Sequence, residues 1–429
     1  MTMLLWEVRG TSTGSSWRHT GVALDIKNTV SQPHTIRSVN SYYLDALFRK
    51  FLPFYFSILL VLIGIGSWHQ VEFHEGFNIG DWLINYQGGF VRRGFMGESL
   101  YLLSKLTSIS PAILLVFLQT SIFGIYFFFS YKLLLQKKDL LKYSILIFSP
   151  FLFTFAINSQ AGGYRKEILY FAILAFVTYA KNFYHQDKLR KIILWILFLF
   201  PIILLTDEVG FVIIPLITAI YLISGPLSSR STLFLFLLLL ENAAIFLLIL
   251  FQHQATDYQI NTILQSLISS GYDPQGAGAI GALKDPLMVN ILQVKDGILH
   301  GDFLLVYPVV LLFASLAYLP FRQELKKIFS SKSLRIGLTV SSMMLLTLVV
   351  IAQDWGRWFY IFFVELFMLI LIVDNEQQND GKTIFLRYSF RRLVFFIFFL
   401  ICYASFWYIP HVLEAGSSLK NMFHNIPGL

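Results

Sequence analysis

Long apolar stretches alternate with short polar gaps from residue 53 to near the end of the chain. A helix that spans a bilayer needs about 20 mainly apolar residues, and fewer where it is buried or ends early. By this criterion the pattern predicts about eleven spans, over residues 53–68, 110–135, 141–157, 167–181, 190–206, 209–224, 232–252, 302–320, 334–352, 358–373 and 392–409. We therefore expect an all-α fold, a polytopic transmembrane helical bundle in which residues 51–429 form a single domain.

The first fifty residues lack such a pattern. Ser, Thr, Gly and scattered charges occur there without a sustained apolar period, and without the apolar core or small-residue cleavage site of a signal peptide. We expect residues 1–50 to be a disordered cytoplasmic tail, or else an extension added by an over-long choice of start site.

Composition supports a membrane protein. Hydrophobic residues make up 56% of the chain and charged residues 14%, whereas about a quarter of a soluble domain is charged. The net charge of +8 comes from short basic clusters between apolar runs, so it indicates membrane orientation and not nucleic-acid binding. The single cysteine, Cys402, lies in an apolar run and offers neither an internal disulfide nor a cysteine-based metal site.

Lysine and arginine gather in alternate gaps, which must share one side of the membrane. These gaps contain the basic residues of segments 49–50, 132–142, 181–191, 230, 322–335 and 382–392. The positive-inside rule makes this side cytoplasmic. The N-terminus is then cytoplasmic and, with an odd number of spans, the C-terminus is external.

The other gaps bring compact charged groups to the external side, with glycine or aromatic residues beside most of them. They are segments 81–98, 162–167, 206–210, 253–301 and 353–358. Two external loops result, 69–108 and 253–301. The second is long enough to cover a site, and we expect it to be mobile, with amphipathic helices near 258–270 and 286–299. Its glycine run, 276–281, follows no strand, so it does not indicate a nucleotide site.

Segment 81–97 is the most unusual external stretch because Arg92 and Arg93 are adjacent and flanked by four glycines. Glycine permits tight turns and close backbone approach, and arginine binds phosphate oxygens bidentately while keeping its charge. The pair is predicted to bind substrate phosphate. The alternative is a helix end at which both side chains meet lipid headgroups.

Three external carboxylates are candidates for catalysis: Asp81, Asp207 and Glu208. Asp81 is either a helix N-cap or a general base. Asp207 and Glu208 lie between two spans with almost no loop, where ionised carboxylates need partners, so they form either a polar hairpin turn or part of the site.

Further arginines and aromatic residues complete the predicted site. Arg165 and Arg357 are expected to bind phosphate, although Arg357 and Asp354 have the i,i+3 spacing of an intrahelical salt bridge. The supporting residues are Asp354, Tyr86, Tyr164 and Trp355. Aromatic rings suit stacking on sugars, and the candidates for this role are Trp82, Tyr86, Tyr164, Trp355 and Trp358. The His and Glu residues of segment 69–75 match no metal motif, so we predict no metal and no cofactor.

Arginines and carboxylates at an external membrane face suit sugar transfer from a polyprenyl-linked donor. The arginines offset the charge that develops on the phosphate leaving group, and a carboxylate deprotonates the acceptor hydroxyl. The activated lipid supplies the driving force, so no ATP site is needed.

With these residues and this architecture, the chain resembles the GT-C superfamily of lipid-dependent glycosyltransferases and is similar to Wzy-type O-antigen and capsule polymerases. The resemblance implies that Asp81 activates the acceptor and that Arg92 or Arg93 binds phosphate. It also implies a bacterial inner-membrane location, an external active face, a polyprenyl-linked sugar or oligosaccharide as partner, and other glycan-assembly proteins nearby. The chain departs from the GT-C pattern in lacking a large C-terminal soluble domain, and from the polymerases in having one long loop where they often have two.

A transporter or flippase for a lipid-linked glycan or anionic substrate is the alternative function. Glu241 and Glu365 lie inside apolar spans, and a membrane-buried acid is a functional candidate. The sequence shows no clear internal repeat and no matched pair of broken helices, which are the signs of that class.

Overall fold

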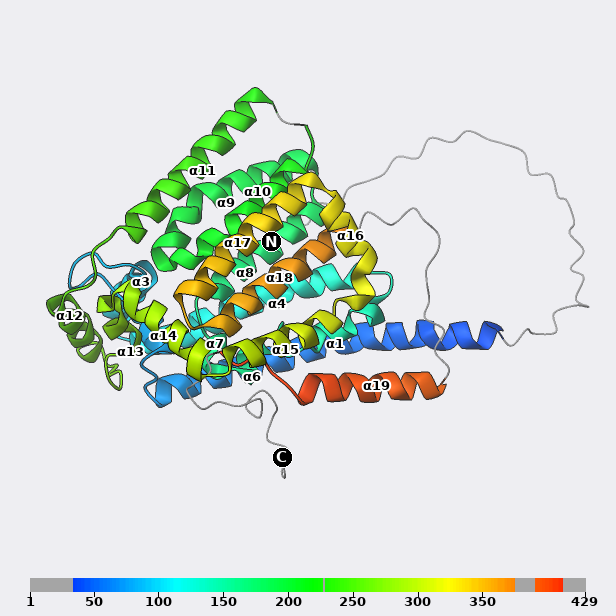
Figure 1. Cartoon of the computed structure of the whole chain (residues 1–429), viewed down its shortest axis with the longest axis horizontal. Coiled ribbons are helices and arrows are strands. Elements are labelled where there is room, and N and C mark those ends of the chain that lie inside the picture. Colours follow the sequence, from blue (N-terminus) through cyan, green and yellow to red (C-terminus); the bar gives the residue numbers. More distant parts are fainter. Residues whose placement is uncertain (1–33, 227, 375–389, 412–429) are drawn as a thin grey trace, which may run out of the picture.

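The computed structural model describes residues 34–226, 228–374 and 390–411, which form an elongated bundle of helices (Figure 1). The described elements are α1 (His34–Glu72), α2 (Asn78–Leu83), α3 (Phe95–Thr107), α4 (Pro111–Leu135), η1 (Leu140–Tyr143), α5 (Ser144–Ile147), α6 (Phe155–Asn158), α7 (Gln160–Gly163), α8 (Glu167–Phe183), α9 (Gln186–Thr206), η2 (Glu208–Ile213), α10 (Ile214–Leu222), α11 (Ser229–Leu250), α12 (Asp257–Ile268), α13 (Gly278–Gly281), η3 (Ala282–Lys284), α14 (Leu287–His300), α15 (Phe303–Leu316), η4 (Leu319–Phe321), α16 (Arg322–Ser330), α17 (Lys332–Ile351), α18 (Trp355–Val373) and α19 (Phe390–Ser405). No strand occurs among these described residues, so the all-α prediction is confirmed for them.

Six described helices are long and apolar enough to cross a membrane: most of α1 (Leu44–Glu72), α4, α9, α11, α17 and α18. The pair α14 and α15, bent by 85° at their junction, would make a seventh if the pair is one span. These helices support a multi-pass membrane protein. The remaining predicted spans coincide with shorter helices, such as α8 with its 17 residues, or with broken segments.

The predicted span over 141–157 is not one helix. It consists of η1, α5 and α6, with turns between Phe148 and Thr154. Pro150 has no backbone N–H to continue a helix, and the three residues after it are fully buried or nearly so. Side chains satisfy part of the irregular backbone, since the Tyr55 hydroxyl donates to the carbonyl of Ile147 and Thr154 donates to that of Ser149.

Helix α18 forms the centre of the bundle, and 89% of its most apolar stretch is buried inside the protein. It packs against α8, α16 and α17, while α4 packs between α1 and α8, and α10 packs against α17. Small residues permit the last contact. A Cβ at Gly337 of α17 would lie 2.7 Å from the Cβ of Ala219 and 2.9 Å from the carbonyl oxygen of Pro215, both on α10.

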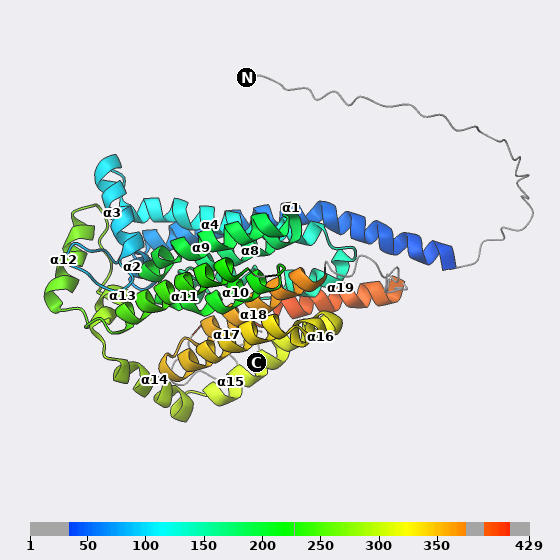
Figure 2. The same ribbon diagram turned by 90° about the horizontal axis from the view of Figure 1, so that it is seen from above.

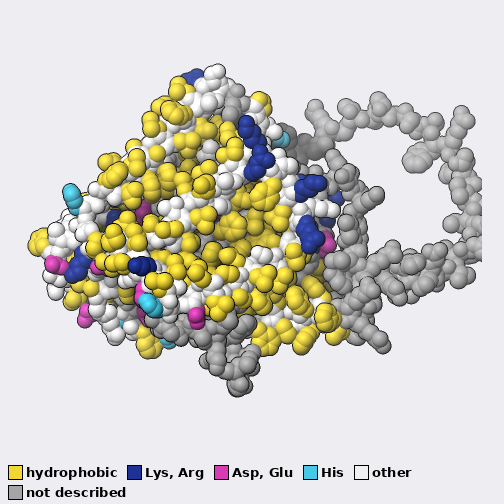
Figure 3. All heavy atoms as spheres, in the orientation of Figure 1, with side chains coloured by type: hydrophobic (Ala, Val, Ile, Leu, Met, Phe, Trp, Pro, Cys, Tyr) yellow, Lys and Arg dark blue, Asp and Glu magenta, His cyan; other side chains and the backbone are white. Residues whose placement is uncertain are grey.

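The two ends of the bundle differ in charge (Figure 3). On the face shown, Lys and Arg side chains gather toward the end with α16, whereas most Asp, Glu and His side chains lie toward the opposite end. Polar contacts join predicted cytoplasmic gaps at the α16 end: Lys142 forms an ion pair with Glu324 at 2.6 Å, and Arg49 donates to the backbone carbonyl of Leu135. The helices α2, α3, α12, α13 and α14 cover the other end (Figure 2).

The predicted tail lies partly outside the described residues. Residues 1–33 are not among them, and from His34 onward the chain belongs to α1. The basic segment 382–392 falls mostly in the gap between 374 and 390, and the C-terminal residues after 411 are also outside the described chain.

Candidate functional site

A cavity of about 2130 Å³ opens at the end of the bundle opposite α16. Its lining brings together most of the charged residues predicted from separate external segments, namely Asp81, Arg92, Arg93, Arg165, Glu208, Asp354 and Arg357. Asp207 is adjacent to these residues but does not line the cavity. The structure therefore brings these separate charged segments to one cavity, while the external location and the role of each residue stay predictions.

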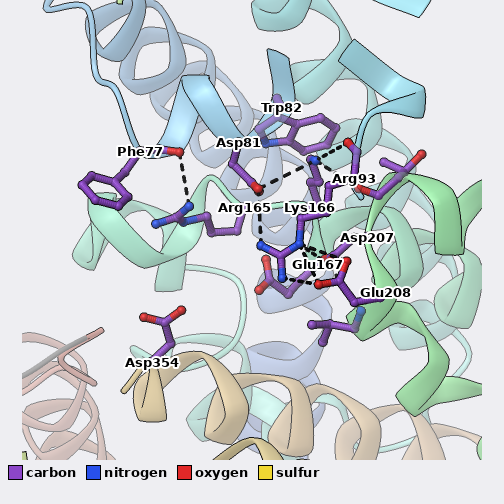
Figure 4. Close-up of polar contacts among 12 residues, drawn as sticks. Phe77, Asp81, Trp82, Arg93, Arg165, Lys166, Glu167, Asp207, Glu208 and Asp354 are labelled. Carbon is purple, nitrogen blue, oxygen red and sulfur yellow. Dashed lines mark hydrogen bonds and ion pairs between the residues drawn. The ribbon is translucent and has the colours of Figure 1, made fainter. Parts of the chain in front are cut away.

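Arg93 is the centre of the first charge cluster (Figure 4). Its Nε donates to both carboxylate oxygens of Glu208, at 2.9 and 3.0 Å, and its Nη2 lies 2.7 Å from Glu208 Oε1. The guanidinium also lies 3.6 Å from Asp81 and 3.9 Å from Asp207. The backbone of Arg93 adopts φ of 64°, a left-handed conformation that is uncommon for a residue with a side chain. The tight turn therefore aims this arginine at three carboxylates.

Lys166 is a member of this cluster that the sequence did not single out. Its side chain is fully buried, and its Nζ donates to the carbonyls of Arg93 at 3.1 Å and Thr206 at 3.0 Å. Nζ also lies 3.8 Å from Asp81. Burial lowers the pKa of Lys166, although Asp81 and Asp207 oppose this shift. The lysine connects the 69–108 loop to the start of α8 and the end of α9.

The carboxylates of the cluster have different proton affinities. Burial alone would raise the pKa of Asp81, but Lys166 and Arg93 outweigh it and bring the pKa to about 2. Arg93 lowers the pKa of Glu208 to about 2, although burial opposes this shift. For Asp207, burial prevails over Arg93 and raises the pKa to about 7. Asp81 and Glu208 are thus ionised near neutral pH, and Asp207 is the carboxylate that titrates there.

A second cluster surrounds Arg357 at the start of α18. Its Nε donates to Glu167 at 2.6 Å, its Nη2 also contacts Glu167, and its Nη1 donates to Asp354 at 2.7 Å. The i,i+3 pair considered from the sequence is therefore formed. His411, which the sequence did not single out, lines the same cavity with its Nε2 at 3.6 Å from Asp354. Because two carboxylates occupy its donors, Arg357 is less suited to phosphate than predicted.

Arg92 and Arg165 are the cavity arginines that form no ion pair with a carboxylate in the described chain. Arg165 is 8% exposed, and donates from Nη1 to the carbonyl of Phe77 at 3.2 Å and from Nε to that of Ala161 at 3.4 Å. Burial lowers the pKa of both arginines, and a neighbouring arginine adds to this effect in each case. Arg165 is buried and Arg92 is half-buried, and a guanidinium withdrawn from water without an anion is stabilised by an anionic ligand. These two side chains are therefore the strongest candidates to bind phosphate.

Of the five aromatic residues predicted to stack on sugar, Trp82, Tyr86, Tyr164 and Trp355 do not line the cavity. Tyr164 is 1% exposed and has a structural role, since its hydroxyl donates to Ile63 and its carbonyl accepts from Trp82 Nε1 at 2.8 Å. Tyr86 stacks on Phe90, and Trp355 packs edge-on against Phe303. The sequence could not separate these core aromatics from Trp358, which does line the cavity.

The long loop covers the cavity, as its length suggested. Helices α12 and α14 fall on the two predicted amphipathic segments, and a capping box between Thr256 and Gln259 begins α12. The glycine run packs on the 69–108 loop, where the backbone N–H of Ala279 donates to the carbonyl of Gly76 at 3.1 Å. Within the described residues, no group of three or more His, Cys, Asp or Glu side chains is arranged to hold a metal ion.

One side of the cavity is apolar. Phe246 and Leu250 of α11 face this space together with Met344, Leu348 and Ile351 of α17. The cavity thus joins a wall of apolar side chains to a charged floor. Such a cavity is complementary to an amphiphilic ligand that carries an anionic group.

The fold and the cavity define a helical protein of multi-pass membrane type with a charged site at one end. Comparison with protein-family models, curated proteins and solved structures gives no match to this chain. The relation to GT-C transferases or Wzy-type polymerases is therefore a proposal that depends on the site alone.

Proposed function

We propose that the chain is a membrane glycosyltransferase or polysaccharide polymerase that transfers a sugar or glycan from a polyprenyl-(pyro)phosphate donor. The proposal includes a GT-C-like bundle of about eleven spans in a bacterial inner membrane, with the N-terminus cytoplasmic, the C-terminus external and the cavity at the external face. The observation that carries it is one cavity containing two arginines without carboxylate partners, an ionised buried aspartate and an apolar wall.

Arg165 and Arg92 would bind the donor phosphate. Their charges are unpaired in the described chain, whereas Arg93 and Arg357 are already paired with carboxylates. As the bond between the anomeric carbon and the phosphate oxygen breaks, the electron pair stays with the phosphate. The two guanidinium groups stabilise that developing charge more than the ground state, which lowers the barrier.

Asp81 would position the acceptor hydroxyl and take its proton. Its Oδ1 is buried without a hydrogen-bond donor, and Lys166 and Arg93 keep the carboxylate ionised. A carboxylate of low pKa is a weak base, so it takes the proton late, after the new bond from the acceptor oxygen to the anomeric carbon has largely formed. Glu208 holds Arg93, and Arg93 in turn orients Asp81.

The apolar wall suits the polyprenyl chain. The side chains from α11 and α17 continue the cavity toward the part of the bundle that would lie in lipid. A donor could then place its phosphate at the arginines while its hydrocarbon chain stays in an apolar environment. The basic gaps at the opposite end support an external location for this cavity.

Complementation of a deletion strain tests the proposal. Asp81→Asn and Arg165→Ala should abolish or shorten the surface glycan at wild-type membrane abundance. Asp296→Asn is the matched control, because Asp296 also lines the cavity but is exposed and, among the described residues, forms an ion pair with His300 alone. Normal glycan from both well-expressed site variants would contradict the proposal.

Transport of a lipid-linked glycan is the second candidate, favoured by one buried acid. Glu365 of α18 is fully buried, and both of its carboxylate oxygens lie 2.7 Å from the Ser341 hydroxyl of α17. If Glu365→Gln abolishes the glycan while Asp81→Asn and Arg165→Ala do not, the transport function is favoured over transfer.

A further inference from the structure

A second cavity, of about 590 Å³, lies between α9 and α11 near the first residues of both helices. Helix α11 begins at the end of the bundle away from α12 and α13 (Figure 1). Among the described lining residues, three are basic (Arg190, Lys191 and Arg230) and one, Asp187, is acidic. The cavity therefore has a net positive charge at the proposed cytoplasmic end.

Arg190 is held in one orientation. Its guanidinium stacks on the ring of Tyr221, with the Cζ atom 5.5 Å from the ring centroid, and its Nη2 donates to the carbonyl of Gly225. Its Nε is buried and has no hydrogen-bond partner among the described residues. The guanidinium has no carboxylate partner among the described residues, and because Arg190 lines the cavity it is suited to an anionic ligand there.

Two hydroxyl groups and the start of α11 lie in the same cavity. Ser228 caps α11 by accepting from the backbone N–H of Ser231, and the two serine hydroxyls are 2.5 Å apart. Arg230, between them in sequence, is exposed and forms no ion pair among the described residues. The arginines, the serines and the positive end of α11 together fit a phosphate group.

The wall next to these polar groups is apolar and open. Leu233, Phe234 and Leu237 follow Arg230 along α11 and are 58%, 48% and 50% exposed. Leu194 of α9 lines the same cavity. A free phosphate would use only the polar half of this surface. A phospholipid would use both halves, with its headgroup at the arginines and its acyl chains along α11.

We propose that this cavity binds the headgroup of an anionic phospholipid of the cytoplasmic leaflet. The phosphodiester lies between Arg190 and Arg230, and the acyl chains contact Leu233, Phe234 and Leu237. The site is separate from the transfer cavity, and the inference does not depend on the proposed transferase activity.

Lipid binding to the purified full chain tests the proposal. The protein in neutral detergent is titrated with dioleoyl phosphatidylglycerol, and the bound fraction is measured by native mass spectrometry. Dioleoyl phosphatidylcholine has the same chains without net charge. We expect the phosphatidylglycerol affinity to fall by about 10- to 30-fold in Arg190→Ala/Arg230→Ala, because each lost cation weakens attraction to an anionic lipid.

The control is Arg322→Ala/Arg335→Ala, which removes the same charge from exposed positions at the same end. It should bind phosphatidylglycerol like the wild type. Arg230→Ala alone, at an exposed position, tests the site should the double variant fold poorly. Equal loss in the control, equal binding of phosphatidylcholine, or displacement of the lipid by millimolar inorganic phosphate would each overturn the proposal.

Discussion

Replacing Arg357 by alanine tests whether this arginine stabilises the fold or binds substrate. Arg357 and Glu167 are 6% and 4% exposed at their side chains, and Arg357 also contacts Asp354 at 2.7 Å. The variant leaves Glu167 charged and without this partner. Removing one partner of a buried ion pair costs about 3–5 kcal/mol. We therefore expect Arg357→Ala to lower membrane abundance and to lower the apparent melting temperature by several degrees.

The assay is thermal denaturation of the detergent-purified protein, followed by fluorescence-detected size exclusion. Arg165→Ala is a matched control, because Arg165 is also buried but has no carboxylate partner in the described chain. It should melt close to the wild type. The double variant Arg357→Gln/Glu167→Gln should recover part of the loss, since neither charge is then left alone. An Arg357→Ala protein that is as stable and abundant as the wild type would refute this reasoning.

Three further predictions concern the 253–301 loop and the charged residues in and beside the large cavity. Gly88→Ala should make the 253–301 loop more sensitive to proteolysis, because the added Cβ would clash with backbone atoms of α12 at 2.7 Å. Gly64→Ala is the control, since its Cβ would lie 3.6 Å from the nearest atom, and it should leave cleavage unchanged. Folding raises the Asp207 pKa from 3.8 to about 7, so this group's contribution to stability is present at low pH and is lost as pH rises through that window. The stability of Asp207→Asn relative to the wild type should therefore increase between about pH 4.5 and 8. Melting temperatures of the two proteins that change in parallel over this pH range would contradict the raised pKa of Asp207. Arg92→Ala and Arg165→Ala should each slow transfer by about 100-fold without loss of abundance, and unchanged rates in an assay with extracted lipid donor would exclude them as phosphate ligands.

The sequence predicted the helical class and the convergence of distant charges for simple physical reasons. Apolar runs of helix length indicate membrane helices, and the basic gaps divide the connecting loops between two sides. Those two rules are enough to assign Asp81, Arg93, Arg165 and Glu208 to one side of the membrane, and the structure places them in one cavity. They contain no information about the partner that each charged side chain selects.

Partner choice and core packing are three-dimensional properties. Arg165 and Lys166 are adjacent, yet one lines the cavity and the other is buried against backbone carbonyls. The pairing of Arg357 with Glu167, 190 positions away, has no local signal. Likewise, hydropathy alone could not distinguish the broken segment around Pro150 from a continuous helix, because both are apolar runs.

The most direct test of the account is the pool of polyprenyl-linked glycans in a deletion strain, measured by mass spectrometry of extracted lipids. If the cavity transfers glycan from such a donor, the deletion should accumulate a specific polyprenyl-linked intermediate. The wild-type gene and Asp296→Asn should clear it, whereas Asp81→Asn and Arg165→Ala, at equal abundance, should not. An unchanged lipid-linked pool in the deletion strain would contradict the proposed function.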